Sequence, residues 1–91
     1  MEIQLSNQSK KQLLDIFIYT LINWGENQAN IYLNSFYIKF DSIATLPRHG
    51  RFLFVENGWE FRKILNKRHI IHYVISDSII FITEIKSQYQ L

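Results

Sequence analysis

A change of hydrophobic period divides this chain into two parts. Before residue 47 apolar side chains recur every three or four positions, and after residue 50 they alternate with polar ones or run continuously. The first period places side chains along one stripe of a helix, whereas the second places them on the faces of β-strands. Pro47 stands at the boundary, where it ends a helix. The sequence therefore predicts a helical part followed by a sheet part.

The helical part is predicted to be two helices joined by a very short turn. Ser6 can cap the first helix by accepting hydrogen bonds from free backbone N–H groups, and Gly25 can end it after Trp24. The second helix is predicted from Glu26 to Leu46. Its apolar positions share one stripe: Ala29, Leu33, Phe36, Phe40 and Ile43. Two helices with so short a connection must pack antiparallel as a hairpin.

The sheet part is predicted to contain four strands, over 51–55, 59–65, 69–75 and 79–85, and residues 2–5 alternate as a short strand does. Asn57-Gly58 is a strong hairpin signal. Near-continuous Ile, Val and Phe in the last two strands indicates a central position in the sheet. The predicted fold class is α+β, with an N-terminal strand and an antiparallel helical hairpin packed on a C-terminal antiparallel β-sheet.

Length and composition place further bounds on the protein. With 91 residues, one domain over 1–91 is expected, and 47% hydrophobic residues suffice for a core. Cysteine is absent, which excludes disulfides and thiolate metal sites and suits a reducing cytosol. The N-terminus has no signal-peptide pattern, and no apolar run approaches the length of a membrane span. We therefore expect a cytoplasmic protein without membrane attachment.

The charge is distributed unevenly along the chain. Residues 1–47 carry three lysines against four acidic residues, whereas residues 48–91 carry seven lysines and arginines against four acidic residues. A surplus of cations on the sheet part suggests an acidic partner or nucleic acid, and a solvated sheet edge explains it equally well. The candidate basic functional face consists of Arg62, Lys63, Lys67, Arg68 and His69.

The side chains that could carry chemistry do not form a recognisable catalytic or metal site. His69 and His72 are three positions apart on a predicted strand, so their side chains should point to opposite faces and cannot share one metal. No Ser/His/Asp set, phosphate-binding glycine loop or carboxylate pair can be assembled. We therefore predict no catalytic residues, no metal and no cofactor.

An ordered set of residues over some eighty positions resembles the ParE/RelE superfamily of toxin–antitoxin toxins, and ParE most closely. The residues that carry the resemblance are Trp24-Gly25, Gln28-Ala29, Tyr32, Pro47 with Gly50-Arg51, the strand from Gly58 to Lys63 and the strand from His69 to Tyr73. The resemblance implies a toxin that poisons DNA gyrase, so that it acts by binding protein and not as an enzyme. It also implies a cognate antitoxin as partner, with nucleic acid contacted only through the antitoxin or gyrase.

Two alternatives follow from the same resemblance. One is a RelE-like ribosome-dependent mRNA endonuclease, in whose relatives basic side chains on this sheet bind mRNA and assist cleavage. Arg62 stands at a position where such a role in mRNA binding and cleavage is plausible. However, Glu84 and Ser87 replace the family's usual Arg and His, and the tail 87–91 adds one tyrosine and no charge. A carboxylate facing a substrate phosphate would repel it. The other alternative is a degenerate toxin kept for antitoxin binding and autoregulation.

The resemblance also suggests where an antitoxin would bind. The helical part carries more aromatic side chains than one narrow stripe needs, although most should belong to the core. The surplus would fit a groove that receives an amphipathic antitoxin segment. The candidate antitoxin-binding groove consists of Tyr32, Phe36 and Phe40.

Overall fold

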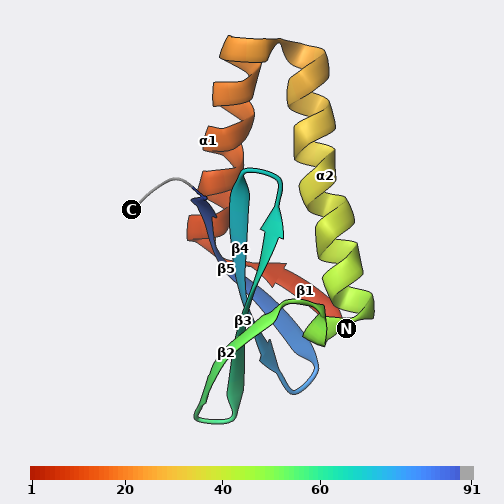
Figure 1. Ribbon diagram of the computed structural model, residues 1–91, viewed down its shortest axis with the longest axis vertical. Helices are drawn as coiled ribbons and strands as arrows, with labels where there is room; N and C mark the ends of the chain where they lie inside the picture. Colours follow the sequence, from red (N-terminus) through yellow and green to blue (C-terminus); the bar gives the residue numbers. More distant parts are fainter. Residues whose placement is uncertain (89–91) are drawn as a thin grey trace.

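A computed structural model describes residues 1–88, which form two long helices packed against a five-stranded sheet (Figure 1). The chain begins with β1 (Glu2–Leu5), α1 (Asn7–Trp24), α2 (Glu26–Thr45) and the short 3-10 helix η1 (Pro47–His49). Four strands follow: β2 (Arg51–Glu56), β3 (Trp59–Asn66), β4 (His69–Ser76) and β5 (Ile79–Ser87). The predicted element order and the α+β class are confirmed.

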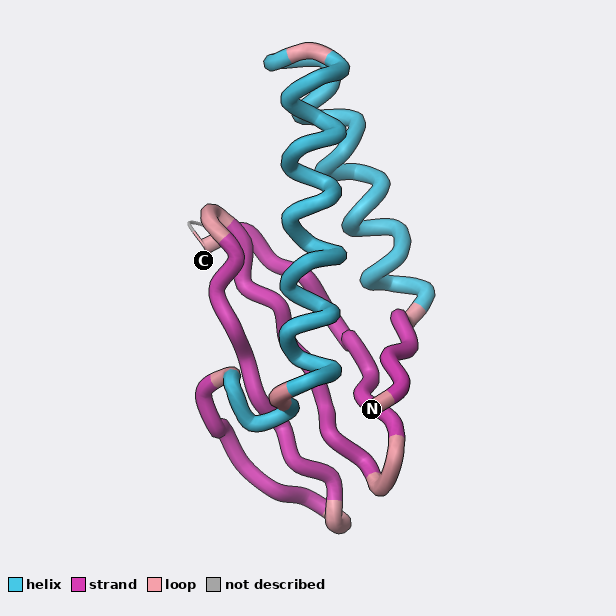
Figure 2. Tube along the Cα trace, turned by 90° about the vertical axis from the view of Figure 1, so that its right-hand side faces the viewer, coloured by secondary structure: helices cyan, strands magenta, loops and turns pink. Residues whose placement is uncertain are grey.

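Local signals explain the helical hairpin. The Ser6 side chain accepts a hydrogen bond from the Ser9 N–H at 3.0 Å and so caps α1. Gly25 separates the two helices with a φ of 92°, a region that favours glycine, and its N–H donates to the Leu21 carbonyl at 3.0 Å. A single residue therefore reverses the chain, and the far end of the hairpin rises beyond the sheet (Figures 1 and 2).

The strand order is β1-β5-β4-β3-β2, so β4 is the central strand. Strands β2 to β5 pair antiparallel, as predicted. The sequence did not predict a partner for β1, which pairs parallel to β5 and makes the sheet mixed. The Met1 amino group also donates to the Ala44 carbonyl at 2.9 Å, and this bond holds the start of the chain against the end of α2.

A β-bulge in β5 decides which side chains of that strand face the helices. Tyr73 pairs with Ile82 and His72 pairs with Glu84, so Thr83 is an extra residue between the two pairs. As a result Ile82 and Ile85 both lie in the core, although three positions separate them. Glu84 shares its side of the sheet with His72, on the face away from the helices.

The core lies between the hairpin and one face of the sheet. One helix crosses in front of the strands in Figure 2. Side chains from both layers form a single buried cluster: Leu13, Phe36, Phe40, Ile43, Ile71, Tyr73, Ile75, Ile80, Ile82 and Ile85. Four of the five residues of the predicted α2 stripe are buried, and Leu33 is partly buried against the cluster. Within residues 1–88, neither helix combines the length and the apolar character that crossing a membrane requires.

Candidate functional site

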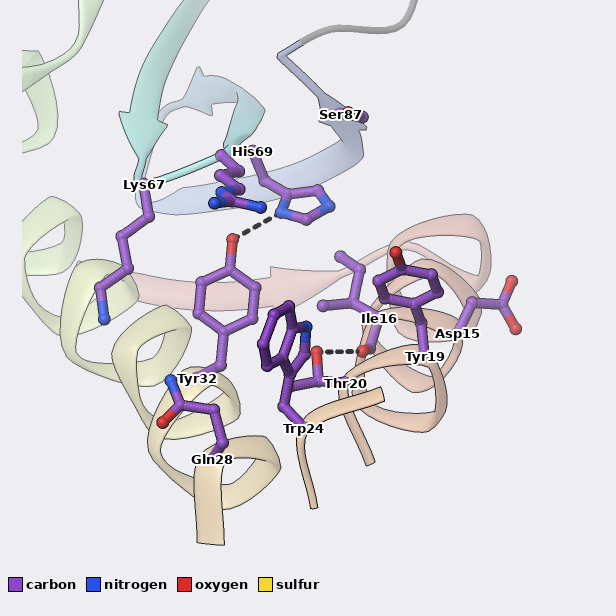
Figure 3. Close-up of a pocket in the computed structure, with 11 residues that line it drawn as sticks. Asp15, Ile16, Tyr19, Thr20, Trp24, Gln28, Tyr32, Lys67, His69 and Ser87 are labelled. Carbon is purple, nitrogen blue, oxygen red and sulfur yellow. Dashed lines mark hydrogen bonds between the residues drawn. The ribbon is translucent and has the colours of Figure 1, made fainter. Parts of the chain in front are cut away.

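A groove of about 730 Å³ lies between the helical hairpin and the turn that joins β3 to β4 (Figure 3). The hairpin contributes Asp15, Ile16, Tyr19, Thr20, Trp24, Gln28 and Tyr32, and the sheet contributes Lys67, Arg68, His69 and Ser87. The groove forms because the helical hairpin extends beyond the sheet. The outer half of the hairpin therefore has no strand packed against it. It brings aromatic and cationic side chains together on one concave surface.

Tyr32 and His69 are hydrogen-bonded across the groove, with the Tyr32 hydroxyl 2.6 Å from Nδ1 of His69 (Figure 3). Burial lowers the pKa of His69 below its ordinary 6.5 and raises the pKa of Tyr32 above its ordinary 10.0. Arg68 opposes part of the shift in the pKa of Tyr32. Both shifts favour the uncharged forms, so the contact joins a neutral phenol and a neutral imidazole, and the tautomer of His69 determines which of the two donates.

The turn residues Lys67 and Arg68 bring positive charge to the same groove. Lys67 has a φ of 57°, a left-handed conformation that is uncommon for a residue with a side chain. Its Nζ lies 5.6 Å from the centre of the Tyr32 ring, within the range of a cation–π contact. The groove therefore offers two cations beside a neutral Tyr–His pair, an arrangement suited to an anionic or acidic group.

The five residues of the predicted basic face do not lie on one surface. Lys67, Arg68 and His69 line the groove. Arg62 pairs with Tyr73 in the register of the sheet and so points toward the helices, whereas Lys63 pairs with His72 and points to the opposite face. Successive residues of a strand must separate in this way. The structure thus brings together three of the five residues.

Arg62 has a structural role inside the protein. Its guanidinium donates to the Glu60 carboxylate and to the Gly50 carbonyl, the latter at 2.6 Å, and its side chain is only 13% exposed. The hydrogen bond from Arg62 is the main reason that the pKa of Glu60 lies below its ordinary value. Arg62 is therefore neutralised within its own chain, and this contact ties β3 to the segment between α2 and β2.

The predicted antitoxin-binding groove requires a correction. Phe36 and Phe40 are 0% and 4% exposed and belong to the core, because the apolar stripe of α2 faces the sheet. Phe36 therefore cannot line a groove, and Phe40 borders only a separate, smaller hollow next to β1. Of the three predicted residues only Tyr32 borders the groove described here.

His69 and His72 lie on opposite faces of the sheet, as the sequence predicted. His69 contacts Tyr32 on the helix side, and His72 pairs with Lys63 and Glu84 on the other side. The part of the chain that the structure describes contains no group of three or more His, Cys, Asp or Glu residues placed to hold a metal. Tyr89, the tyrosine of the predicted C-terminal tail, lies outside the described residues.

Sequence reasoning missed the contribution of the hairpin to this groove. Trp24 and Tyr19 are 69% and 66% exposed and border it. Trp24 adjoins the chain reversal at Gly25, and a side chain at the far end of a hairpin has fewer neighbours to cover it. The position of Trp24 next to a predicted turn was the signal that could have identified it as accessible.

Comparison with known proteins agrees with this architecture. Residues 3–91 match a family model described as the ParE toxin of the type II toxin–antitoxin system parDE. No curated protein sequence gives a significant match.

Two solved structures are similar in fold. A chain of the chromosomal ParDE TA system from P. aeruginosa has a TM-score of 0.78 and 13% sequence identity, with 96% of this chain and 95% of that chain covered. A chain of the archaeal RelE-RelB complex from Pyrococcus horikoshii OT3 has a TM-score of 0.73 and 13% identity, with 99% and 97% covered. Because the family model spans nearly the whole sequence, the chain belongs to the ParE toxin family of type II toxin–antitoxin systems.

Proposed function

We propose that this chain is the growth-inhibiting toxin of a type II toxin–antitoxin system, that it poisons DNA gyrase in the cytoplasm, and that a cognate antitoxin neutralises it. The match to the ParE family over residues 3–91 is the observation that carries the proposal. The chain would act by binding gyrase and stabilising its cleaved complex with DNA. The proposal therefore assigns no catalytic residue to this protein.

The surroundings of Arg62 and Glu84 support a binding protein over a nuclease. RNA cleavage needs cations aimed at the charge that develops on the phosphate, together with a proton donor and acceptor. Arg62 is neutralised by Glu60 and is nearly buried. Glu84 places a carboxylate on the last strand, beside His72 and on the same face as Lys63. The Glu84 carboxylate opposes the binding of a phosphate on that face.

The proposal is tested with purified protein in two parallel assays. In the first, DNA gyrase and supercoilable plasmid are incubated with increasing toxin, and we expect loss of supercoiling together with linear DNA. In the second, translating ribosomes are incubated with toxin, and we expect intact mRNA. Induction without an antitoxin should also stop bacterial growth. Normal growth while folded protein accumulates would contradict the proposal.

One observation favours a second candidate, a RelE-like ribosome-dependent endonuclease. The groove places Tyr32 and His69 within hydrogen-bonding distance and adds Lys67 and Arg68 to the same lining. Such a set could move a proton and stabilise an anion. Cleaved mRNA with unaffected gyrase would establish this candidate. If the protein neither inhibits gyrase nor causes cleavage of mRNA, but still binds its antitoxin, it would instead be a degenerate toxin kept for autoregulation.

The antitoxin is proposed to bind the outer half of the hairpin and the adjoining groove. Ile22 and Trp24 are 77% and 69% exposed, so this end of the molecule offers apolar surface for the anchors of an amphipathic segment. Lys67 and Arg68 would receive acidic side chains of the same segment. This location replaces the one predicted along Phe36 and Phe40.

Substitution of Arg68 tests this binding site. Arg68→Glu should weaken the antitoxin complex and make its salt dependence shallower, because a cation facing acidic groups is removed. Lys10→Glu is the matched control, since it makes the same charge change on an exposed position near the start of α1, away from the groove. Arg62 should not be used for this purpose, because its replacement would disturb the fold.

A further inference from the structure

The face of the sheet away from the helices, which we call the open face, carries an aromatic cluster of its own. Phe54 stacks on Phe61 with ring centres 4.4 Å apart, and Trp59 stacks on Phe81 at 5.8 Å. Beneath these rings Val74 is only 2% exposed, although no helix covers it. Phe54 and Trp59 themselves remain 48% and 44% exposed. The cluster shields its own centre and leaves an aromatic outer layer accessible.

The apolar side chains of this cluster form a row across the sheet. Phe54, Phe61, Val74 and Phe81 are successive register partners on β2, β3, β4 and β5, and Gln4 continues the row on β1. The row is centred on Val74 of β4, which is the middle strand. An apolar stripe centred in this way can be covered by a flat surface of similar width.

The next row of the open face is charged in an ordered manner. Arg51, Lys63, His72 and Glu84 are successive register partners from β2 to β5. Cations therefore lie on one side of β4 and a carboxylate lies on the other. Glu84 also pairs with Lys86 at 3.5 Å, but both side chains remain partly exposed, at 31% and 50%. The Glu84 carboxylate is thus accessible to a second cation.

We infer that the open face is the contact surface between two copies of this chain, related by a two-fold axis that runs along β4. Such an axis places β3 of one copy over β5 of the other. Lys63 of each copy then faces Glu84 of its partner, and Phe61 of each copy faces Phe81 of its partner. The face is complementary to itself, which a two-fold interface requires. Two sheets stacked in this way lie about 10 Å apart, with aligned strands and the aromatic side chains between them.

The charges of the open face favour a second copy over nucleic acid. The strand positions on this face carry three cations, Arg51, Lys63 and Lys86, and three acidic residues, Glu2, Glu56 and Glu84. A surface that binds nucleic acid needs a surplus of cations for the phosphates. A face without net charge, with a surplus of one cation on β2 and β3 and a surplus of one carboxylate on β5 and β1, instead suits a partner with the same charges in reversed order.

The first test is a charge exchange, read by sedimentation equilibrium of the full chain. The unmodified protein should approach twice its monomer mass of 11.0 kDa as concentration rises. Lys63→Glu and Glu84→Lys should each raise the dimer dissociation constant by about tenfold or more, because each places like charges opposite each other at two symmetric positions. The double variant Lys63→Glu/Glu84→Lys should restore dimerisation, since it exchanges both partners of each contact.

The controls separate dimerisation from folding. Lys11→Glu changes an exposed lysine of α1 and should leave the dissociation constant unchanged. Far-UV circular dichroism of each variant establishes that the fold is intact. The inference is overturned if the unmodified protein stays monomeric up to about 500 μM, well above the dissociation constants of specific interfaces. It is also overturned if the double variant dimerises no better than either single variant.

A crosslinking measurement locates the axis directly. The chain has no cysteine, so a single introduced thiol reports only on its own position. His72→Cys places a thiol beside the proposed axis, and a bismaleimide that spans about 10 Å, the distance between stacked sheets, should link two copies efficiently. Asn34→Cys, on the exposed side of α2, should give little linked product at equal concentration. Equal crosslinking of both variants would exclude the open face as the interface.

Neither the charge exchange nor the crosslinking involves gyrase or an antitoxin, so the inference can fail while the proposed function holds.

Discussion

At the scale of single residues, Tyr73 fixes the junction between the helical part and the sheet. Its hydroxyl donates to the Pro47 carbonyl at 2.7 Å and accepts from the Gly50 N–H at 2.9 Å, while the residue is only 1% exposed. Burial raises the pKa of Tyr73, so the hydroxyl keeps its proton. A Cβ on Gly50 would collide with this hydroxyl and would lie 2.8 Å from the Lys63 carbonyl oxygen. Glycine is required at this position for close approach.

Two substitutions test this junction. Gly50→Ala should lower the free energy of unfolding by about 1–3 kcal/mol, because the added methyl group forces the packed chain apart. Tyr73→Phe should cost about 1–3 kcal/mol, since it removes the hydrogen-bond partner of the buried Gly50 N–H and of the partly buried Pro47 carbonyl. Urea denaturation measures both, and Tyr19→Phe, on an exposed tyrosine, is the control expected within about 0.5 kcal/mol of the original. A neutral Gly50→Ala would show that the junction can relax.

Lys67 provides a second prediction at this scale, because its φ of 57° limits what can replace it. Lys67→Gly should leave the free energy of unfolding within about 0.5 kcal/mol, since relief of the left-handed conformation offsets the flexibility of glycine. Lys67→Val should cost about 1–3 kcal/mol, because a β-branched residue is strained there. Thermal unfolding of both variants and of the unmodified protein measures these differences in stability. Equal stabilities would mean that the turn changes its conformation.

At the scale of elements, the bulge at Thr83 decides the identity of the open face. If Thr83 occupied a regular position in the ladder and did not bulge, β5 would alternate from Ile82, and Glu84 would point toward the core in place of Ile85. The Thr83 hydroxyl donates to the His72 carbonyl at 3.2 Å across the bulge. The bulged conformation at Thr83 thus keeps the Glu84 carboxylate out of the hydrophobic interior.

Deletion of Thr83 should leave the faces of β5 unchanged. Without this residue, Ile82, Glu84 and Ile85 can keep Tyr73, His72 and Ile71 as their partners in a regular ladder, so Glu84 stays on the open face. We expect the deletion variant to be folded at 25 °C by circular dichroism and to be about 1 kcal/mol less stable in urea denaturation, because the Thr83 hydrogen bond is lost. Thr83→Ser, which retains the residue count and the hydroxyl, is the control. An unfolded deletion variant would show that the bulge itself is needed for the packing of β5.

At the scale of the whole molecule, two half-buried histidines on opposite faces make stability depend on pH. Burial lowers the pKa of both His69 and His72, and for His72 the nearby cations Lys86 and Lys63 add to this effect while Glu84 opposes it. The unfolded chain, with histidine pKa values near 6.5, then binds more protons than the folded chain as the pH falls below that value. Stability should accordingly be greatest above about pH 6.5 and should decline in acid.

This pH dependence can be measured by urea denaturation between pH 7.5 and pH 5. The free energy of unfolding should decrease across that range, and His69→Gln and His72→Gln should each reduce the decrease. His49→Gln, on an exposed residue of η1, controls for removal of an imidazole as such. If the free energy of unfolding decreases equally in all the variants, titratable groups other than His69 and His72 cause the pH dependence.

The sequence alone determined the elements of this protein because their signals are local. The helical stripe ending at Ile43, the Ser6 cap, the reversal at Gly25, the stop at Pro47 and the Asn57-Gly58 turn each depend on a few neighbouring residues. Their order, together with the residues of the ParE resemblance, was sufficient for the α+β class and for the family.

The arrangement of the candidate site was decided only in the tertiary structure. The separation of Arg62 from Lys63, the burial of Phe36 and Phe40, and the Tyr32–His69 contact depend on which strands and helices meet. The bulge at Thr83 and the parallel pairing of β1 depend on contacts between distant parts of the chain. Periodicity tells which residues share a face, but a shift of one residue inverts every face of a strand. Long-range packing therefore determines which side chains become core and which form a surface.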